Sequence, residues 1–179
     1  MTEGSAERRA TIRPAVTADA LCVAVLGQQV FLDTYATDGI RPGIAREVRS
    51  QFDLDVVRAL LAAPSTRCVV AERDGHLVGF AQCVTKEPHE HVRAVRPIKL
   101  NRLYVQERFA GTGVGTALLA QVEAMARAEG CDTVWLTTWI GNARALAFYP
   151  SRGYVDVGAT LYVFEDEAHE NRVFAKALR

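Results

Sequence analysis

The chain has 179 residues, which is enough for one domain with a full hydrophobic core and would make two domains cramped. Hydrophobic residues make up 49% and charged residues 23%, the composition of a soluble globular protein rather than a disordered one. The 21 basic and 21 acidic residues cancel, so the chain lacks the net positive field of broad nucleic-acid binders. No apolar run is long enough to cross a bilayer, and residues 1–10 are too polar for a signal peptide. We therefore expect a cytoplasmic protein that binds neither nucleic acid nor membrane.

The cysteines and histidines do not indicate a metal site. The four cysteines show no CxxC spacing and are expected to be buried and reduced: Cys22, Cys68, Cys83 and Cys131. His89-Glu90-His91 could suggest metal ligands, but no third ligand lies nearby at helical or hairpin spacing. We expect a solvated loop there and no bound metal.

The first half of the chain alternates between helical and β-type patterns. Residues 1–10 are expected to form a disordered tail, and residues 11–179 a single domain. The expected elements are a strand at 11–15, a helix from about Asp19 to Tyr35, a loop at 38–43 and a second helical stretch that ends near 63–64. Two β-rich runs at 67–73 and 76–86 flank Asp74-Gly75, which predicts a hairpin.

A polar segment at 87–96 precedes a strand at 98–105 in which the spacing of apolar residues changes. The apolar residues occupy even-numbered positions at first and odd-numbered positions afterwards. A β-bulge at Asn101-Arg102 would produce this one-residue shift. A strand buried on both faces would show the same pattern without a bulge.

The second half predicts a parallel βαβ unit. The helix after residue 113 has an apolar stripe, with Glu123 outside it, and the next strand spans 133–139. Strand, helix and strand in this length place the two strands parallel. Asn142 can cap a helix that runs through Tyr149, and a terminal hairpin spans about 154–178. The order predicts an α+β fold with a central βαβ unit.

The most informative segment joins the two halves of that βαβ unit. Gly111, Gly113 and Gly115 alternate just before the helix, so backbone N–H groups can approach a ligand closely. The free N–H groups and positive dipole end of the helix add to this, which suits a pyrophosphate. A glycine-rich turn that only lets helix and strand pack closely remains an alternative.

Two nucleotide-binding motifs fit this loop poorly. A P-loop needs Lys after its last glycine, where this chain has Thr116. A dinucleotide fingerprint needs Gly or Ala at that same position, and an acidic residue at the end of the next strand, where Trp139 stands. A dinucleotide-dependent oxidoreductase is therefore a weak alternative.

Over about residues 12–178 the sequence resembles the GNAT superfamily of N-acetyltransferases. Two motifs carry the resemblance. The first is Leu103–Val105 with Ala110–Leu119, which is similar to the family's acetyl-CoA loop. The second is Trp139–Tyr149 with Gly153-Tyr154, which is similar to the family's N-x-x-A-x-x-F-Y…G-F segment. Residues 162–167 with 171–173 resemble the PaiA-like and diamine acetyltransferase branch. The resemblance implies a mixed, mostly antiparallel twisted sheet with helices on both faces, and acetyl-CoA between two splayed parallel strands.

The resemblance also implies roles for individual residues. The acetyl-CoA-binding residues would be Leu103, Tyr104, Val105, Gly111, Thr112, Gly113, Val114, Gly115, Thr116 and Asn142. Backbone amides of residues 111–116 would hold the pyrophosphate, the edge of 103–105 would pair with the pantetheine, and an N–H there would stabilise the oxyanion. Asn142 would hydrogen-bond the pantetheine arm, and Tyr149 would protonate the departing thiolate. A Tyr149 that only packs on the sheet is the simpler alternative.

The expected reaction is acetyl transfer from acetyl-CoA to a primary amine of a small molecule, polyamine-like or other, by direct attack in a ternary complex. An acyl-CoA sensor without catalysis is the alternative, and a homodimer is implied by resemblance alone. The candidate general bases are Glu72, Glu87, His89, Glu90 and His91, and the pattern selects none of them.

Four residues depart from the family's usual pattern. Ala110 replaces a frequent Arg or Gln, which removes one side-chain contact to phosphate. Lys99 and Ile140 stand where the related branch often has an acid, which weakens the case for a polyamine. Pro150 disfavours helical geometry at Tyr149, so the helix is expected to end or kink there.

Overall fold

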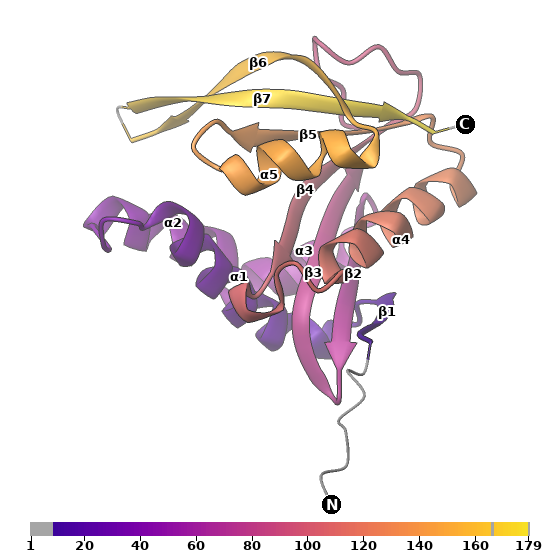
Figure 1. The fold of residues 1–179 in the computed structure, drawn as a ribbon. Coiled ribbons are helices and arrows are strands. Elements are labelled where there is room, and N and C mark those ends of the chain that lie inside the picture. Colours follow the sequence, from indigo (N-terminus) through magenta and orange to yellow (C-terminus); the bar gives the residue numbers. More distant parts are fainter. Residues whose placement is uncertain (1–8, 166, 179) are drawn as a thin grey trace, which may run out of the picture. The chain divides into compact units, whose positions relative to one another are not determined.

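The computed structural model describes residues 9–165 and 167–178 (Figure 1). Most of the expected tail at 1–10 therefore lies outside the described residues. The helices are α1 (Ala20–Tyr35), α2 (Pro42–Phe52), α3 (Leu54–Ala62), α4 (Val114–Ala128) and α5 (Ala143–Phe148), with short 3-10 turns η1 (Thr17–Asp19), η2 (Glu107–Phe109) and η3 (Pro150–Arg152). The strands are β1 (Thr11–Pro14), β2 (Thr66–Arg73), β3 (His76–Thr85), β4 (Pro97–Val105), β5 (Thr133–Trp139), β6 (Val155–Phe164) and β7 (Glu167–Ala177).

The strands form a seven-stranded sheet in the order β1-β2-β3-β4-β5-β7-β6. Strand β4 pairs with β5 in parallel, as the βαβ pattern predicts, while β1 with β2, β5 with β7 and β6 with β7 are antiparallel. The parallel register joins the first three residues of each strand, from Pro97↔Thr133 to Lys99↔Trp135. The α+β fold class is therefore confirmed.

By its internal contacts the chain divides into two compact units. Of the described residues, the first unit comprises those within 1–63, 68–81 and 102–121, and the second those within 64–67, 82–101 and 122–179. The single domain expected over 11–179 stays a prediction.

The first unit has an aromatic core. The Phe52 ring lies 6.1 Å from Phe31 and 6.0 Å from Tyr104, whose ring is 5.4 Å from Phe80. Gly27 lies directly against the Phe52 ring, where a Cβ would collide with it. Helix α1 therefore requires a residue without a side chain at this point.

The helical stretch expected up to residue 63 is two helices, and the loop expected at 38–43 is shorter. Helix α2 already begins at Pro42, because proline fits the first helical position, where its missing N–H is not needed. Asp53 then adopts extended backbone angles, φ −60° and ψ 143°, and ends α2. Its side chain accepts a hydrogen bond from the Asp55 N–H and thereby caps α3.

The hairpin predicted at Asp74-Gly75 is confirmed. Asp74 has φ +51° and Gly75 φ +78°, and two consecutive left-handed residues match the twist of the strands that they join.

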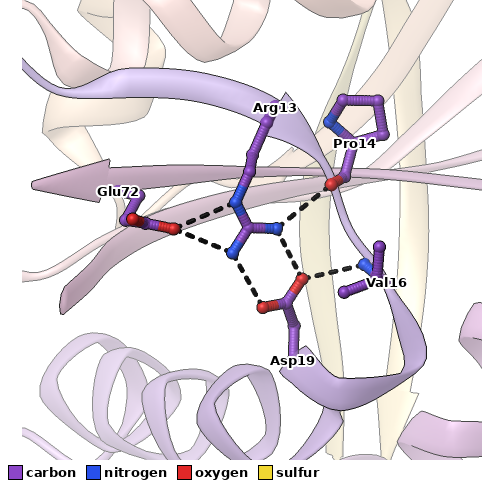
Figure 2. Close-up of polar contacts among 5 residues, drawn as sticks. All are labelled: Arg13, Pro14, Val16, Asp19 and Glu72. Atoms are coloured by element: carbon purple, nitrogen blue, oxygen red, sulfur yellow. Dashed lines mark hydrogen bonds and ion pairs between the residues drawn. The ribbon is translucent and has the colours of Figure 1, made fainter. Parts of the chain in front are cut away.

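A partly buried ion cluster joins β1, β2 and η1, just before α1 (Figure 2). The Arg13 guanidinium donates to both Asp19 oxygens, at 2.8 and 2.9 Å, and its Nε donates to Glu72 at 2.9 Å. Asp19 also accepts the Val16 N–H at 2.8 Å. These bonds hold the pKa of Asp19 below its ordinary value, the Arg13 bond contributing most.

In the second unit the terminal hairpin expected at about 154–178 consists of two long strands, β6 and β7 (Figure 1). The register shifts between Asp156 and Gly158, which marks a bulge in β6.

The expectation that Glu123 lies outside the apolar stripe of α4 is wrong. Its side chain is buried, and both carboxylate oxygens accept hydrogen bonds from the Lys176 ammonium on β7 at 2.8 Å. An ion pair makes this burial possible, since an unpaired carboxylate would be too costly there.

Candidate functional site

The glycine segment is a tight turn between η2 and α4. Gly111 has φ +76° and Gly113 φ +91°, and no atom lies within 4 Å of the position that a Cβ would take on either. Glycine is therefore needed here for its backbone conformation and not for lack of space. Gly115 belongs to the first turn of α4, so the expected loop of three glycines contains two.

The same turn presents unused hydrogen-bond donors. In the described residues, the N–H groups of Gly111, Gly113, Val114 and Gly115 make no backbone hydrogen bond outside helices and strands. The Thr112 N–H donates to the Phe109 carbonyl at 3.4 Å, and the ladder of α4 begins with the Ala117 N–H on the Gly113 carbonyl at 3.0 Å. Together with the helix dipole, this arrangement suits an anion.

The strand before this turn places the three predicted residues Leu103, Tyr104 and Val105, all partly buried. Gly79 of β3 lies beside them, and a Cβ on it would stand 2.8 Å from the Tyr104 carbonyl oxygen. The Gln106 N–H then donates to the Val78 carbonyl at 3.0 Å. The bulge at Asn101-Arg102 stays a prediction.

Two arginines near the turn were not among the site residues predicted from the sequence. The guanidinium carbons of Arg73 and Arg108 lie 5.7 and 5.5 Å from the centre of the Phe109 ring. They bring positive charge to the segment where Ala110 removes a side-chain donor. Arg73 is distant in the sequence, and no pattern at that position indicates this contact.

The other two predicted residues lie in the second unit. Asn142 caps α5 as expected, its side-chain oxygen accepting the Ala145 N–H at 3.1 Å. The helix ends at Phe148, as Pro150 suggested, yet Tyr149 keeps helical angles, φ −65° and ψ −45°, before η3 begins. Gly153, with φ +84°, ends that turn.

Tyr149 is 8% exposed and is enclosed by other rings. Its ring lies 5.3 Å from Phe148, 5.7 Å from Tyr154 and 6.1 Å from Phe174. The Tyr154 hydroxyl is buried and has no hydrogen-bond partner in the described residues. Burial first, and the nearby Glu123 charge second, raise the pKa of Tyr154, so this phenol stays protonated.

The five candidate bases are not equivalent in the structure. Glu72 is engaged by Arg13 in the first unit. In the second unit Glu90 is exposed, whereas Glu87 and His89 contact Trp135 and the His91 ring lies 5.5 Å from His89. Desolvation first, and the neighbouring His91 second, lower the pKa of His89. The structure thus gathers three of the five candidates.

Comparison with known proteins places the chain in a family. The sequence pattern described as "Acetyltransferase (GNAT) family" matches residues 33–154. An uncharacterized N-acetyltransferase of Mycobacterium tuberculosis H37Rv is 32% identical over 118 residues, 63% of this chain and 71% of that protein. An aminoglycoside N(6')-acetyltransferase type 1 of Stenotrophomonas maltophilia is 28% identical over 109 residues, 60% of this chain and 71% of that protein.

Solved structures agree with the fold. The PaiA N-acetyltransferase of Thermoplasma acidophilum, crystallised with coenzyme A, superposes with a TM-score of 0.73 at 16% identity and covers 95% of this chain and 99% of that one. In the described residues no helix combines the length and apolarity needed to cross a membrane. The chain therefore belongs to the GNAT acetyltransferase family, and with it to the acyltransferases that use acetyl-CoA.

Proposed function

We propose that the protein transfers the acetyl group of acetyl-CoA to a primary amine of a small molecule by direct attack in a ternary complex. The observation that supports this most directly is the set of unused N–H groups at Gly111, Gly113, Val114 and Gly115. They lie at the start of helix α4, and free N–H groups at a helix N-terminus suit a diphosphate. Thr112 and Thr116 are the remaining residues of the proposed diphosphate-binding segment. Arg73 and Arg108 supply positive charge in place of the side chain missing at Ala110.

The remaining roles follow from the chemistry of each group. The backbone of Leu103, Tyr104 and Val105 pairs with the pantetheine as an added strand, and one of its N–H groups faces the thioester carbonyl. The Asn142 oxygen is used by the α5 cap, so its amide nitrogen is the part that donates to the pantetheine. The Tyr149 phenol gives its proton to the departing CoA thiolate.

The acceptor is defined by chemical class. The relative named an aminoglycoside acetyltransferase makes amino sugars the first amines to test, and the resemblance of residues 162–167 and 171–173 to the diamine acetyltransferase branch adds polyamines. Lys99 counts against a polycation, because its ammonium repels a second positive charge on the acceptor.

The test measures release of free thiol from acetyl-CoA with a panel of polyamines, amino sugars and amino acids. We expect turnover with at least one amine, identified by mass spectrometry of the acetylated product. Tyr149→Phe should lower kcat by about 10²–10⁴-fold and leave the calorimetric affinity for CoA nearly unchanged. Binding of acetyl-CoA without turnover on any amine would favour a sensor instead.

The homodimer and the cytoplasmic location stay predictions. Sedimentation equilibrium of the purified protein checks the first. The edge strand β6, with Val155, Leu161 and Val163 each 64% or more exposed, is the surface to mutate if a dimer forms.

A further inference from the structure

Arg102 and Tyr104 lie on the face of β4 that α2 covers. Arg102 Nη2 donates to Gln51 Oε1 at 2.8 Å, and the Tyr104 ring lies 6.0 Å from the ring of Phe52, the next residue of α2. Successive side chains of a strand point to opposite faces, so the two residues that alternate with them, 103 and 105, belong to the other face. These contacts all lie within the first unit.

The first half of α4 covers that other face. A Cβ on Gly79 of β3 would stand 3.3 Å from Val105 Cγ2 and 3.2 Å from Leu118 Cδ1, so these two side chains lie on the same side of the sheet. The proposed diphosphate site at residues 111–116 lies at the start of the same helix. Acetyl-CoA bound there reaches β4 from the α4 side, which leaves the α2 side to the amine.

The direction of the pantetheine brings the thioester close to Arg102. The diphosphate site follows β4 in the chain, so a pantetheine that pairs with residues 103–105 runs from Val105 toward Leu103. Its thioester end then lies on the Leu103 side of this segment. Arg102 precedes Leu103 by one residue, a step of about 3.3 Å along a strand. The positive charge of Arg102 is therefore near the thioester, on the face left to the acceptor.

Two contacts hold the guanidinium of Arg102 in place. Its central carbon lies 4.9 Å from the centre of the Phe52 ring, and its Nη2 binds the Gln51 oxygen. The Gln51 nitrogen donates in turn to the Glu47 carboxylate, so the amide is oriented at both ends. The charge of Arg102 acts on its surroundings: burial raises the pKa of Tyr35, and the guanidinium opposes that rise.

We propose that Arg102 selects acceptors that carry a carboxylate as well as the amine, so that the substrate is an amino acid rather than a polyamine. The inference rests on the proposed acetyl transfer and names its substrate class. A guanidinium presents its N–H donors in a planar fork, which matches the two oxygens of one carboxylate. Binding of the acid at this position orients the amine toward the thioester. The same charge repels an acceptor with a second ammonium group.

The test compares each amino acid of the amine panel with its own amide, which keeps the amine and the size but lacks the negative charge. We expect kcat/KM of the wild type to favour the best acid over its amide by about 10²–10³-fold. Arg102→Gln should lose most of that preference, and so should Arg102→Met, which keeps an apolar stem against Phe52. Arg102→Lys keeps the charge without the fork and should retain part of it.

The ratio of the two substrates isolates recognition of the acid. Both are measured on the same protein, so a smaller folded fraction of a variant does not change the ratio. The different basicity of the two amines cancels when a variant is compared with the wild type. Arg58→Gln is the matched control, since Arg58 on α3 is 54% exposed in its side chain and pairs with Asp55. This variant should keep the wild-type preference.

A carboxylic acid that lacks the amine gives a second measurement, which does not depend on turnover. The deamino analogue of the preferred amino acid should bind the wild-type complex with CoA in calorimetry. It should bind the Arg102→Gln complex at least about tenfold more weakly.

Three results would overturn the inference. A wild-type protein that acetylates amides as efficiently as the acids does not recognise a carboxylate. If Arg102→Gln and Arg102→Met keep the wild-type preference, another group binds the acid. Both of these results leave the proposed function intact, whereas a wild-type protein inactive with every amine would refute the proposed function and this inference together.

Discussion

The ion cluster of Arg13, Asp19 and Glu72 gives a sharp prediction for stability. Asp19→Asn keeps the size of the side chain but removes the charge, and it turns an NH₂ group toward the guanidinium. Asp19 is 11% exposed in its side chain and accepts three hydrogen bonds, two from Arg13 and one from the Val16 N–H. Each is a bond to a charged group and contributes about 1.5–3 kcal/mol when buried.

The expected loss is smaller than the sum of these bonds. Arg13 is 34% exposed and keeps its bond to Glu72, so solvent and the second carboxylate compensate in part. We expect Asp19→Asn to lower the free energy of unfolding by about 2–3 kcal/mol at pH 7. For a chain of this size that corresponds to roughly 4–12 °C in Tm.

The way in which this loss of stability depends on pH shows whether its cause is electrostatic. Because the pKa of Asp19 in the folded protein lies below its ordinary 3.8, the stabilisation is complete above about pH 3.8 and declines as the pH falls through the folded-state value. Urea titrations of wild type and variant should thus differ by a constant amount from pH 7 to 5 and converge below pH 3.8. A difference as large at pH 3 as at pH 7 would refute the electrostatic explanation.

Asp55→Asn is the control, since Asp55 is 88% exposed in its side chain and pairs with Arg58 at 3.2 Å. Its effect should stay below about 0.5 kcal/mol at every pH.

Gly113→Ala should weaken CoA binding at least tenfold in calorimetry, because φ +91° strains any residue with a Cβ; unchanged affinity would contradict the proposed diphosphate site. Arg73→Gln combined with Arg108→Gln should lower CoA affinity several-fold and make it less dependent on salt, and equal salt dependence would exclude a phosphate contact. Lys176→Met should destabilise the fold by about 3 kcal/mol at most in urea, because it leaves the buried Glu123 only its longer ion pair with exposed Arg127 at 3.6 Å, and adding Glu123→Leu should restore most of that loss. A double variant less stable than Lys176→Met would refute this account.

Local signals in the sequence predicted the elements that depend on local chemistry. Asp74-Gly75 demands a left-handed turn, and Asn142 caps α5 through its own side chain, so both were visible in a few residues. The division between α2 and α3 was missed although Asp53 is an ordinary capping residue. The apolar periodicity continues across it, and periodicity alone does not show that a helix restarts.

Contacts between distant residues were beyond such reasoning. Glu123 appears solvent-facing from its position on α4, and its partner Lys176 is 53 residues away. The same applies to His91, whose surroundings depend on a bulge in β6, and to Arg73 beside Phe109. The family motif located the glycine turn and Tyr149, but it could not show which candidate base lies in a cluster.

The open space around Gly111 and Gly113 has a consequence for chirality. Both glycines have positive φ, which a D-residue adopts as readily as an L-residue adopts negative φ, so D-alanine should avoid the strain that L-alanine introduces. Semisynthesis with D-alanine at position 113 would therefore stiffen the turn in its native shape and lower the entropy of the unfolded chain. The affinity of that variant for CoA would then show how closely a bound ligand approaches the main chain at position 113.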